Sequence, residues 1–128
     1  MRNWISIRDR YLQDSYSIRL GEIATNLARI GTFTGHPANK EVVYGLLEET
    51  KFFIEWVAAE AEVEVGARLV EMQVQLAVWQ LDWNEIWSEN VERQAIGREA
   101  SKWSDEVMEF SGLLEEGFDS LKKRIQVS

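Results

Sequence analysis

The chain has 128 residues, enough for one domain with its own core, and 45% of them are hydrophobic. It contains no cysteine, which excludes disulfides, thiolate metal sites and cysteine nucleophiles, and its net charge is −8. The N-terminus lacks the apolar run of a secretory signal, and no stretch is long and apolar enough to span a membrane. We therefore expect a single cytoplasmic domain over residues 1–128 that does not enter a membrane.

The first predicted helix covers approximately residues 8–31. Its apolar residues recur at steps of four and three, as one face of a helix requires: Leu12, Tyr16, Leu20, Ile23, Leu27 and Ile30. Gly31 and Gly35 can adopt the positive φ angles that are common just past a helix C-terminus. His36 is the only histidine and follows these glycines, so we interpret it as a turn or capping residue rather than a catalytic base or metal ligand.

The second predicted helix covers approximately residues 39–60, and either Pro37 or Asn39 opens it. Its inner face comprises Val43, Leu46, Leu47, Thr50, Phe53, Ile54 and Val57. Phe52 and Trp56 widen this face considerably. Residues 59–66 contain no turn signature, which leaves a turn and a continuous helix both open. A shift in the phase of the apolar stripe favours a turn, and so does the length of about 75 Å that an unbroken helix over 40–88 would reach.

The third predicted helix, over 63–87, is apolar on two opposite faces. The first stripe comprises Val65, Leu69, Met72, Leu76, Trp79, Trp83 and Ile86. The second stripe lies roughly opposite and comprises Val63, Val70, Val74, Val78 and Leu81. A helix in a solvated bundle needs one apolar face, so a helix with two must be covered on both sides. We assign the first stripe to the core and the second to an interface, although the pattern alone also permits the reverse.

The fourth predicted helix covers approximately residues 89–118, with Ser88 as its N-cap and Glu89 and Glu92 near its N-terminus. Its inner stripe comprises Ile96, Ala100, Trp103, Val107, Phe110 and Leu114, and Leu121 and Ile125 would extend it to residue 125. Gly112 and Gly117 predict a kink or an early end near 112–118. Because the joints between the four segments are short, we expect an all-α, antiparallel up-down four-helix bundle.

The residues that catalysis and metal binding usually require are nearly absent. A di-iron bundle needs an inward Glu-x-x-His on each of two helices, and one histidine in a loop cannot supply that. Glu48, Glu55 and Glu62 recur at heptad spacing, but such a run usually forms a solvated face rather than a cation site. No phosphate-binding loop, nucleophile elbow or zinc spacing is present. We therefore predict no catalytic residue, no cofactor and no metal.

The charges are unevenly distributed along the chain. Residues 1–40 are net basic, whereas residues 41–92 are strongly acidic. The favoured interpretation is that the first segment lies beside the acidic ones, so that Arg8, Arg19 and Arg29 compensate their charge. The alternative is a basic arm for nucleic acid or anionic lipid, which dispersed arginines on a negatively charged chain disfavour. We expect no nucleic-acid partner.

The tryptophans allow two interpretations. Trp79, Trp83 and Trp87 repeat every four residues, while Trp56 and Trp103 lie on neighbouring segments. Trp79, Trp83 and Trp103 could wall a pocket for a flat or hydrophobic ligand. They could equally be ordinary core, which we favour because Trp79 and Trp83 belong to the first stripe.

Two stretches resemble known sequences. Val74-Gln-Leu-Ala-Val-Trp-Gln-Leu-Asp-Trp-Asn-Glu-Ile-Trp87 and Glu99-Ala-Ser-Lys-Trp-Ser-Asp-Glu-Val-Met-Glu-Phe-Ser-Gly-Leu-Leu114 are similar to uncharacterised small helical proteins of cyanobacteria. The resemblance covers about the second half of the chain. It implies a helical fold and brings no activity with it.

These observations favour a non-enzymatic assembly or adaptor protein that acts through helical surfaces. We expect a homodimer, because two-fold pairing is the commonest way to cover an apolar face. The predicted interface comprises Val70, Val74, Val78, Leu81, Phe52 and Trp56. A further protein partner is expected, and the sequence does not identify it. The alternative function is a bundle that binds a small molecule in a pocket lined by Trp79, Trp83 and Trp103.

Overall fold

The computed structural model describes residues 2–113, and every regular element in that range is helical. This confirms the predicted all-α class. The elements, in chain order, are α1 (Trp4–Gln13), α2 (Tyr16–Phe33), η1 (Pro37–Asn39), α3 (Lys40–Val57), η2 (Ala58–Glu60), α4 (Val63–Leu81), α5 (Trp83–Ser88) and α6 (Asn90–Ser111). Within residues 2–113, no helix combines the length and apolarity that crossing a bilayer requires.

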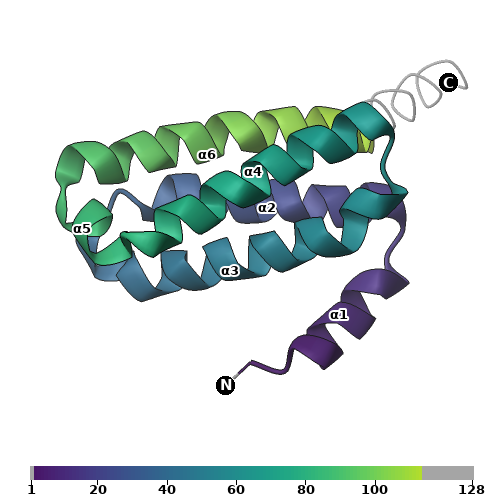
Figure 1. The fold of residues 1–128 in the computed structure, drawn as a ribbon, viewed down its shortest axis with the longest axis horizontal. Helices are drawn as coiled ribbons and strands as arrows, with labels where there is room; N and C mark the ends of the chain where they lie inside the picture. Colours follow the sequence, from purple (N-terminus) through teal and green to yellow (C-terminus); the bar gives the residue numbers. More distant parts are fainter. Residues whose placement is uncertain (1, 114–128) are drawn as a thin grey trace, which may run out of the picture.

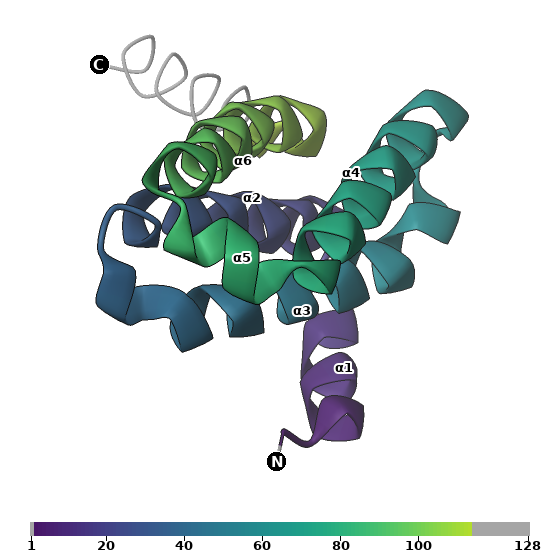
Figure 2. The ribbon, with the colours of Figure 1, turned by 60° about the vertical axis from the view of Figure 1, so that its left-hand side comes forward.

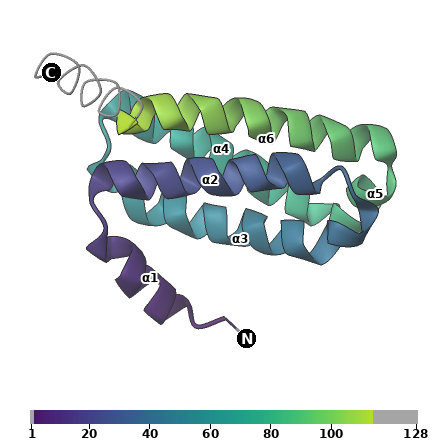
Figure 3. The ribbon, with the colours of Figure 1, turned by 180° about the vertical axis from the view of Figure 1, so that it is seen from behind.

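The four long helices lie side by side, with α2 packed against both α3 and α6 (Figure 1; Figure 3). α4 packs on α3, and the short α5 connects α4 to α6. Figure 2 shows that α4 and α6 splay apart rather than packing along their lengths. α1 contacts α3 and projects from the body at an angle (Figure 1).

The core lies where the predicted inner stripes of the four long helices meet. The largest side chains with no exposed surface are Leu20, Ile23, Leu27, Ile30, Val43, Leu47, Ile54, Val57, Leu69, Met72, Leu76 and Val107. Burying such aliphatic side chains supplies the main driving force for folding, about 1.5–3 kcal/mol for each. The first stripe of residues 63–87 contributes Leu69, Met72 and Leu76 to this set, so it is the stripe that faces the core.

α2 and α6 approach each other closely, and small residues permit it. A Cβ atom added at Gly31 would fall within 3.0 Å of Ser101 Oγ, and one at Gly97 would fall equally close to Thr34 Oγ1. The Ser104 hydroxyl also donates a hydrogen bond to the Ala24 carbonyl at 2.7 Å. Glycine is therefore required at both positions for the backbones to come this near.

The prediction of a single first helix is wrong, because the helix ends at Gln13 and a second one begins after Ser15. Ser15 begins α2 and accepts a hydrogen bond from the Ile18 amide at 3.3 Å, while Asn3 caps α1 in the same way. α1 then turns onto α3, where the Tyr11 ring stacks on Phe53 with centroids 4.0 Å apart. Leu12, assigned to the inner stripe, is 44% exposed.

The third predicted segment is also divided. Asp82, with φ −113° and ψ 36°, interrupts the helix between α4 and α5. At the other end of α4, η2 and the extended Ala61 provide the turn that the phase shift favoured over a continuous helix.

The fourth predicted helix differs from expectation at its N-cap and agrees with expectation at its C-terminal glycine. Ser88 is not the N-cap, since its hydroxyl donates to the Glu85 carbonyl at 2.8 Å and Glu89 takes the capping position. Gly112 adopts a φ of 71° and ends α6, which is the early end that the glycines predicted. The expected continuation to residue 118 or 125 lies outside the described residues.

The loop between α2 and α3 is built by local caps. His36 Nδ1 accepts a hydrogen bond from the Ala38 amide at 3.1 Å, and Pro37 occupies the first position of η1. Asn39 precedes α3 without capping it, because its side-chain amide donates to the Phe33 carbonyl at 3.1 Å. His36 is thus a capping residue, as predicted.

Candidate interaction sites

The second stripe of α4 faces away from the core along the whole helix. Val63 is 88% exposed, Val74 57% and Leu81 82%, and Val70 and Val78 are also exposed. On the opposite face of the same helix, Leu69, Met72 and Leu76 are completely buried. Within residues 2–113, α4 therefore presents a continuous aliphatic face that is exposed on the surface.

Two alanines complete this face into a regular seam. The residues nearest its midline are Val63, Ala67, Val70, Val74, Ala77 and Leu81, which we call the seam. They follow one another at alternating steps of four and three, the spacing of a coiled-coil interface. Before Met72, the seam residues follow the order large, small, large in side-chain size. The same order, read in reverse, follows Met72. The seam therefore has nearly the same profile in both directions.

Phe52 and Trp56 lie largely apart from the seam, against α1. The Trp4 ring packs on Phe52 with centroids 4.3 Å apart, and Tyr11 lies 5.9 Å from Trp56. Both predicted interface residues are consequently half-buried by the chain's own first helix. Phe52 also borders a pocket of about 510 Å³ that it shares with Val74 and Ala77, so it is the member of this pair that adjoins the seam.

Polar side chains fasten α4 to α3 beside the seam. Gln80 donates to Glu48 at 2.8 Å, and Gln73 donates to Glu55 at 3.0 Å. Glu62 stands at the N-terminal boundary of α4. Two of the three acidic residues at heptad spacing thus serve interhelical hydrogen bonds. Over the described range, no group of three or more His, Asp or Glu side chains is placed to hold a metal ion.

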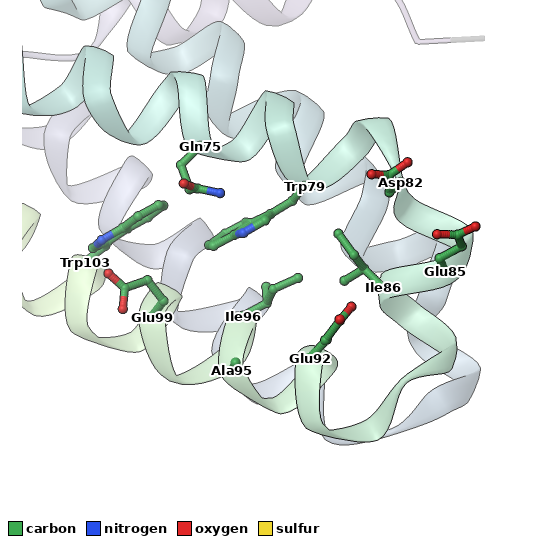
Figure 4. A pocket seen from close by; sticks show the side chains of 10 residues that line it. All are labelled: Gln75, Trp79, Asp82, Glu85, Ile86, Glu92, Ala95, Ile96, Glu99 and Trp103. Carbon is green, nitrogen blue, oxygen red and sulfur yellow. The ribbon is translucent and has the colours of Figure 1, made fainter.

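A pocket of about 660 Å³ opens between α4, α5 and α6, and we call it the indole groove (Figure 4). Its lining residues are Gln75, Trp79, Asp82, Glu85, Ile86, Glu92, Ala95, Ile96, Glu99 and Trp103. The rings of Trp79 and Trp103 stack with centroids 5.2 Å apart and an interplanar angle of 14°. Trp103 and Ile96 are buried, whereas Trp79 is half-buried. The groove therefore has an aromatic and aliphatic floor.

An ion pair joins α4 to α6 beyond the tryptophan stack. Arg68 Nε lies 2.6 Å from Glu106 Oε2, and a second nitrogen of the same guanidinium lies 3.1 Å from Oε1. This two-point hydrogen bonding raises the pKa of Arg68 above its ordinary value. With the stacked tryptophans, the pair holds together two helices whose backbones diverge.

Trp83 does not line the indole groove, so the predicted three-tryptophan pocket is wrong in this member. Its indole N–H donates to the Lys40 carbonyl at 3.3 Å, and that of Trp87 donates to the Pro37 carbonyl at 2.8 Å. The two rings are buried, and their centroids lie 5.3 Å apart. Together they attach α5 to the start of α3. The bend at Asp82 separates Trp83 from Trp79 although both belong to the first stripe.

Arg93 is a buried cation that sequence reasoning missed. Its guanidinium donates to the carbonyls of Thr34 and Trp87, each at 3.0 Å, and to Asn90 Oδ1 at 2.9 Å. It also lies over the Trp87 ring, 5.5 Å from the centroid. Because the carbonyl of Thr34 ends α2, the positive charge meets the negative end of a helix dipole. Its position suits a structural role.

Asp14 and Glu22 form a carboxyl pair between α1 and α2 that was also missed. Burial, a hydrogen bond with Asp14 and the negative charge of Asp14 together raise the pKa of Glu22 to about 7. The two residues were assigned to one continuous helix, eight positions apart, where no contact was expected. The break at Ser15 brings them together.

Two N-terminal arginines do pair with the acidic part of the chain. Arg2 lies 2.9 Å from Glu49, and the buried Arg19 pairs with Glu60. Arg19 also donates from Nε to the Asp14 carbonyl at 3.2 Å. Neither Arg8 nor Arg29 forms an ion pair within residues 2–113. Internal charge compensation therefore holds for some of the basic residues.

Comparisons with known proteins identify no relative of this chain. No protein-family model, curated protein or solved structure matches the chain. The seam and the indole groove are therefore the features that bear on function.

Proposed function

We propose that this protein is a non-enzymatic assembly protein that forms a homodimer through α4. The observation that carries the proposal is the exposure of the seam along about 28 Å of helix. Exposed apolar faces of this extent usually mark interaction sites. Within the described residues, the chain's own helices leave this face uncovered.

The reversed profile of the seam supports an antiparallel two-fold pairing. About an axis near Met72, Val63 of one copy lies opposite Leu81 of the other, Ala67 opposite Ala77, and Val70 opposite Val74. This arrangement places small residues opposite small ones, so that the helices can approach closely. Glu71 falls beside the axis, where Arg68 of the same chain, 3.0 Å away, offsets the repulsion between the two copies of Glu71.

Light scattering after size exclusion tests the proposal. A helix pair of this length is a modest interface, so we expect a dissociation constant of about micromolar order. At concentrations above that value, the unmodified protein should have twice the chain mass of 14.9 kDa. Val74→Glu should give a helical monomer, because it places a charge in the seam. Val42→Glu is the matched control: Val42 is 53% exposed on α3, outside the seam, and should leave the dimer intact. A monomeric unmodified protein would overturn the proposal.

Cross-linking tests the antiparallel register separately. Because the chain has no cysteine of its own, an introduced cysteine is the only thiol that a cross-linker can modify. Gln73→Cys, close to the axis, should be cross-linked to its own copy by a short bis-maleimide. Val63→Cys alone should not be, whereas Val63→Cys combined with Leu81→Cys should be. Efficient cross-linking of Val63→Cys alone would indicate a parallel dimer and refute the register.

A second candidate function is the binding of a small molecule in the indole groove. Its volume of about 660 Å³ falls in the range of roughly 300–1,000 Å³ that is usual for ligand pockets. The Trp79–Trp103 stack gives it a preformed aromatic floor. The two functions use different faces of α4, so one does not exclude the other.

The wider setting of the assembly also belongs to the proposal. We also propose that the dimer is cytoplasmic. In it, each chain is a helical bundle whose α4 is covered by the second copy. A further protein partner would make it an adaptor. The resemblance of its second half to small cyanobacterial helical proteins remains a prediction.

A further inference from the structure

We infer that the indole groove takes an organic cation with an apolar body. This inference rests on the second candidate function, small-molecule binding, and specifies the chemical class of the ligand.

The floor fits an apolar body. Trp79, Ile86, Ile96 and Trp103 contribute its apolar side chains, and they come from α4, α5 and α6. One face of the Trp79 ring stacks on Trp103, and the ring remains half-buried, so part of it is accessible from the groove. Indole is the best of the aromatic rings for attracting a cation to its face.

The rim carries four carboxylates and no cation. Asp82, Glu85, Glu92 and Glu99 line the groove, whereas none of its lining residues is lysine, arginine or histidine. Figure 4 shows these carboxylates distributed around the Trp79 ring, on both sides of the groove. Across residues 2–113, none of the four takes part in a side-chain ion pair. The groove therefore favours positive charge over neutral or negative ligands.

The dimensions of the groove favour a small molecule over a helical peptide. Its lining on α6 runs from Glu92 to Trp103, about 16 Å of helix. α5 closes one end, and the Arg68–Glu106 ion pair crosses from α4 to α6 one turn beyond Trp103. A bound helix longer than about three turns would have to break this ion pair.

The spread of the carboxylates favours an organic cation over a metal ion. A divalent ion needs several oxygen ligands within about 2.0–2.6 Å of one point. In the part of the chain that the structure describes, no three acidic or histidine side chains converge in that way. Their charge instead acts over the length of the groove, as suits a cation carried on an apolar skeleton.

Three probes with one skeleton test the inference: 4-phenylbutylamine, 4-phenyl-1-butanol and 4-phenylbutyrate. We expect calorimetry to show the amine binding at least about tenfold tighter than the alcohol, with the acid weakest. In proton–nitrogen NMR spectra, the indole N–H signals of Trp79 and Trp103 should shift most. Trp79→Leu should abolish binding of the amine.

Two double variants isolate the role of the rim. Glu92→Gln with Glu99→Gln should weaken amine binding by about three- to tenfold and leave the alcohol unchanged. Asp105→Asn with Glu109→Gln removes the same charge from exposed positions of α6 outside the groove, and should change amine binding less than twofold. Equal effects of the two double variants would overturn the cation inference.

The remaining outcomes separate this inference from the function on which it rests. If the alcohol binds as tightly as the amine and Trp79→Leu abolishes both, the groove is a small-molecule site and the cation inference is wrong. If none of the three probes binds at about 1 mM, both the inference and the second candidate function are wrong.

Discussion

Gly97→Ala and Gly45→Ala make the same chemical change in two helices, and we expect them to shift the free energy of unfolding in opposite directions. An alanine in a helix is favoured over glycine by about 1 kcal/mol. At Gly45 in α3, an added Cβ meets no atom within 4 Å, so this gain should appear almost fully, as about 0.5–1 kcal/mol of stabilisation.

At Gly97, packing should outweigh that gain. An added Cβ would stand within 3.0 Å of Thr34 Oγ1 and 3.3 Å from both Thr34 Cβ and the Gly31 carbonyl. Thr34 is buried and donates its hydroxyl to that carbonyl at 3.1 Å, so it cannot turn away without losing a hydrogen bond. Overpacking of this kind costs about 1–3 kcal/mol, which after the gain of about 1 kcal/mol leaves a net destabilisation of up to about 2 kcal/mol.

Urea denaturation followed by far-ultraviolet circular dichroism, at one protein concentration, would measure both changes. Thr34→Ala in the Gly97→Ala background is the rescue variant, because it removes the hydroxyl oxygen that the new Cβ approaches most closely. The reasoning is refuted if Gly97→Ala stabilises the protein as Gly45→Ala does, or if the rescue variant recovers nothing.

Two further predictions concern the core and the carboxyl pair. Leu76→Ala should cost about 2–5 kcal/mol of unfolding free energy in a urea titration, because Leu76 is completely buried; a loss below about 1 kcal/mol would contradict the assignment of the first stripe to the core. Folded Glu22 keeps its proton up to about pH 7, whereas the unfolded chain loses it near the ordinary pKa of 4.5, so this group's contribution to stability is complete below pH 4.5 and declines as the pH rises towards 7. Glu22→Gln should therefore flatten the melting temperature between pH 5 and 7, and an unchanged slope would be inconsistent with the raised pKa.

The sequence predicted the core well, because a helix face repeats with a period of 3.6 residues wherever it is buried. Leu20, Leu47, Leu76 and Val107 were all placed on inner stripes by that rule alone. The two faces of α4 were recognised in the same way. Periodicity carries no information about what covers the second stripe.

Breaks between helices were harder to predict, because apolar periodicity can continue across them. Leu12 and Tyr16 are four residues apart, yet Ser15 begins a new helix between them. The capping side chain of Ser15 was the available signal, and apolar periodicity alone did not reveal it. Asp82 is also of a residue type that favours N-caps, and it precedes α5, but apolar periodicity continues across it and hid the separation of Trp83 from Trp79.

Contacts of single polar residues were the least predictable. Arg93 lies in a helix with many exposed polar residues, and nothing in its neighbours marks it as buried. Its acceptors are mainly backbone carbonyls, one of them in the loop after α2. Backbone acceptors have no residue type, so a sequence pattern cannot encode them.

The tight contact between α2 and α6 has a consequence for how the protein opens. Because backbones packed through Gly31 and Gly97 leave no room for water, amide hydrogens in the middle of these two helices can exchange only when much of the molecule unfolds. α4 lies outside this pair, packed on α3 and joined to α6 only by side chains at two places, so we expect it to detach in a smaller and more frequent fluctuation. Hydrogen exchange would then divide the molecule into a slow α2–α6 pair and a faster α4, the element whose exposed face we propose as the dimer interface.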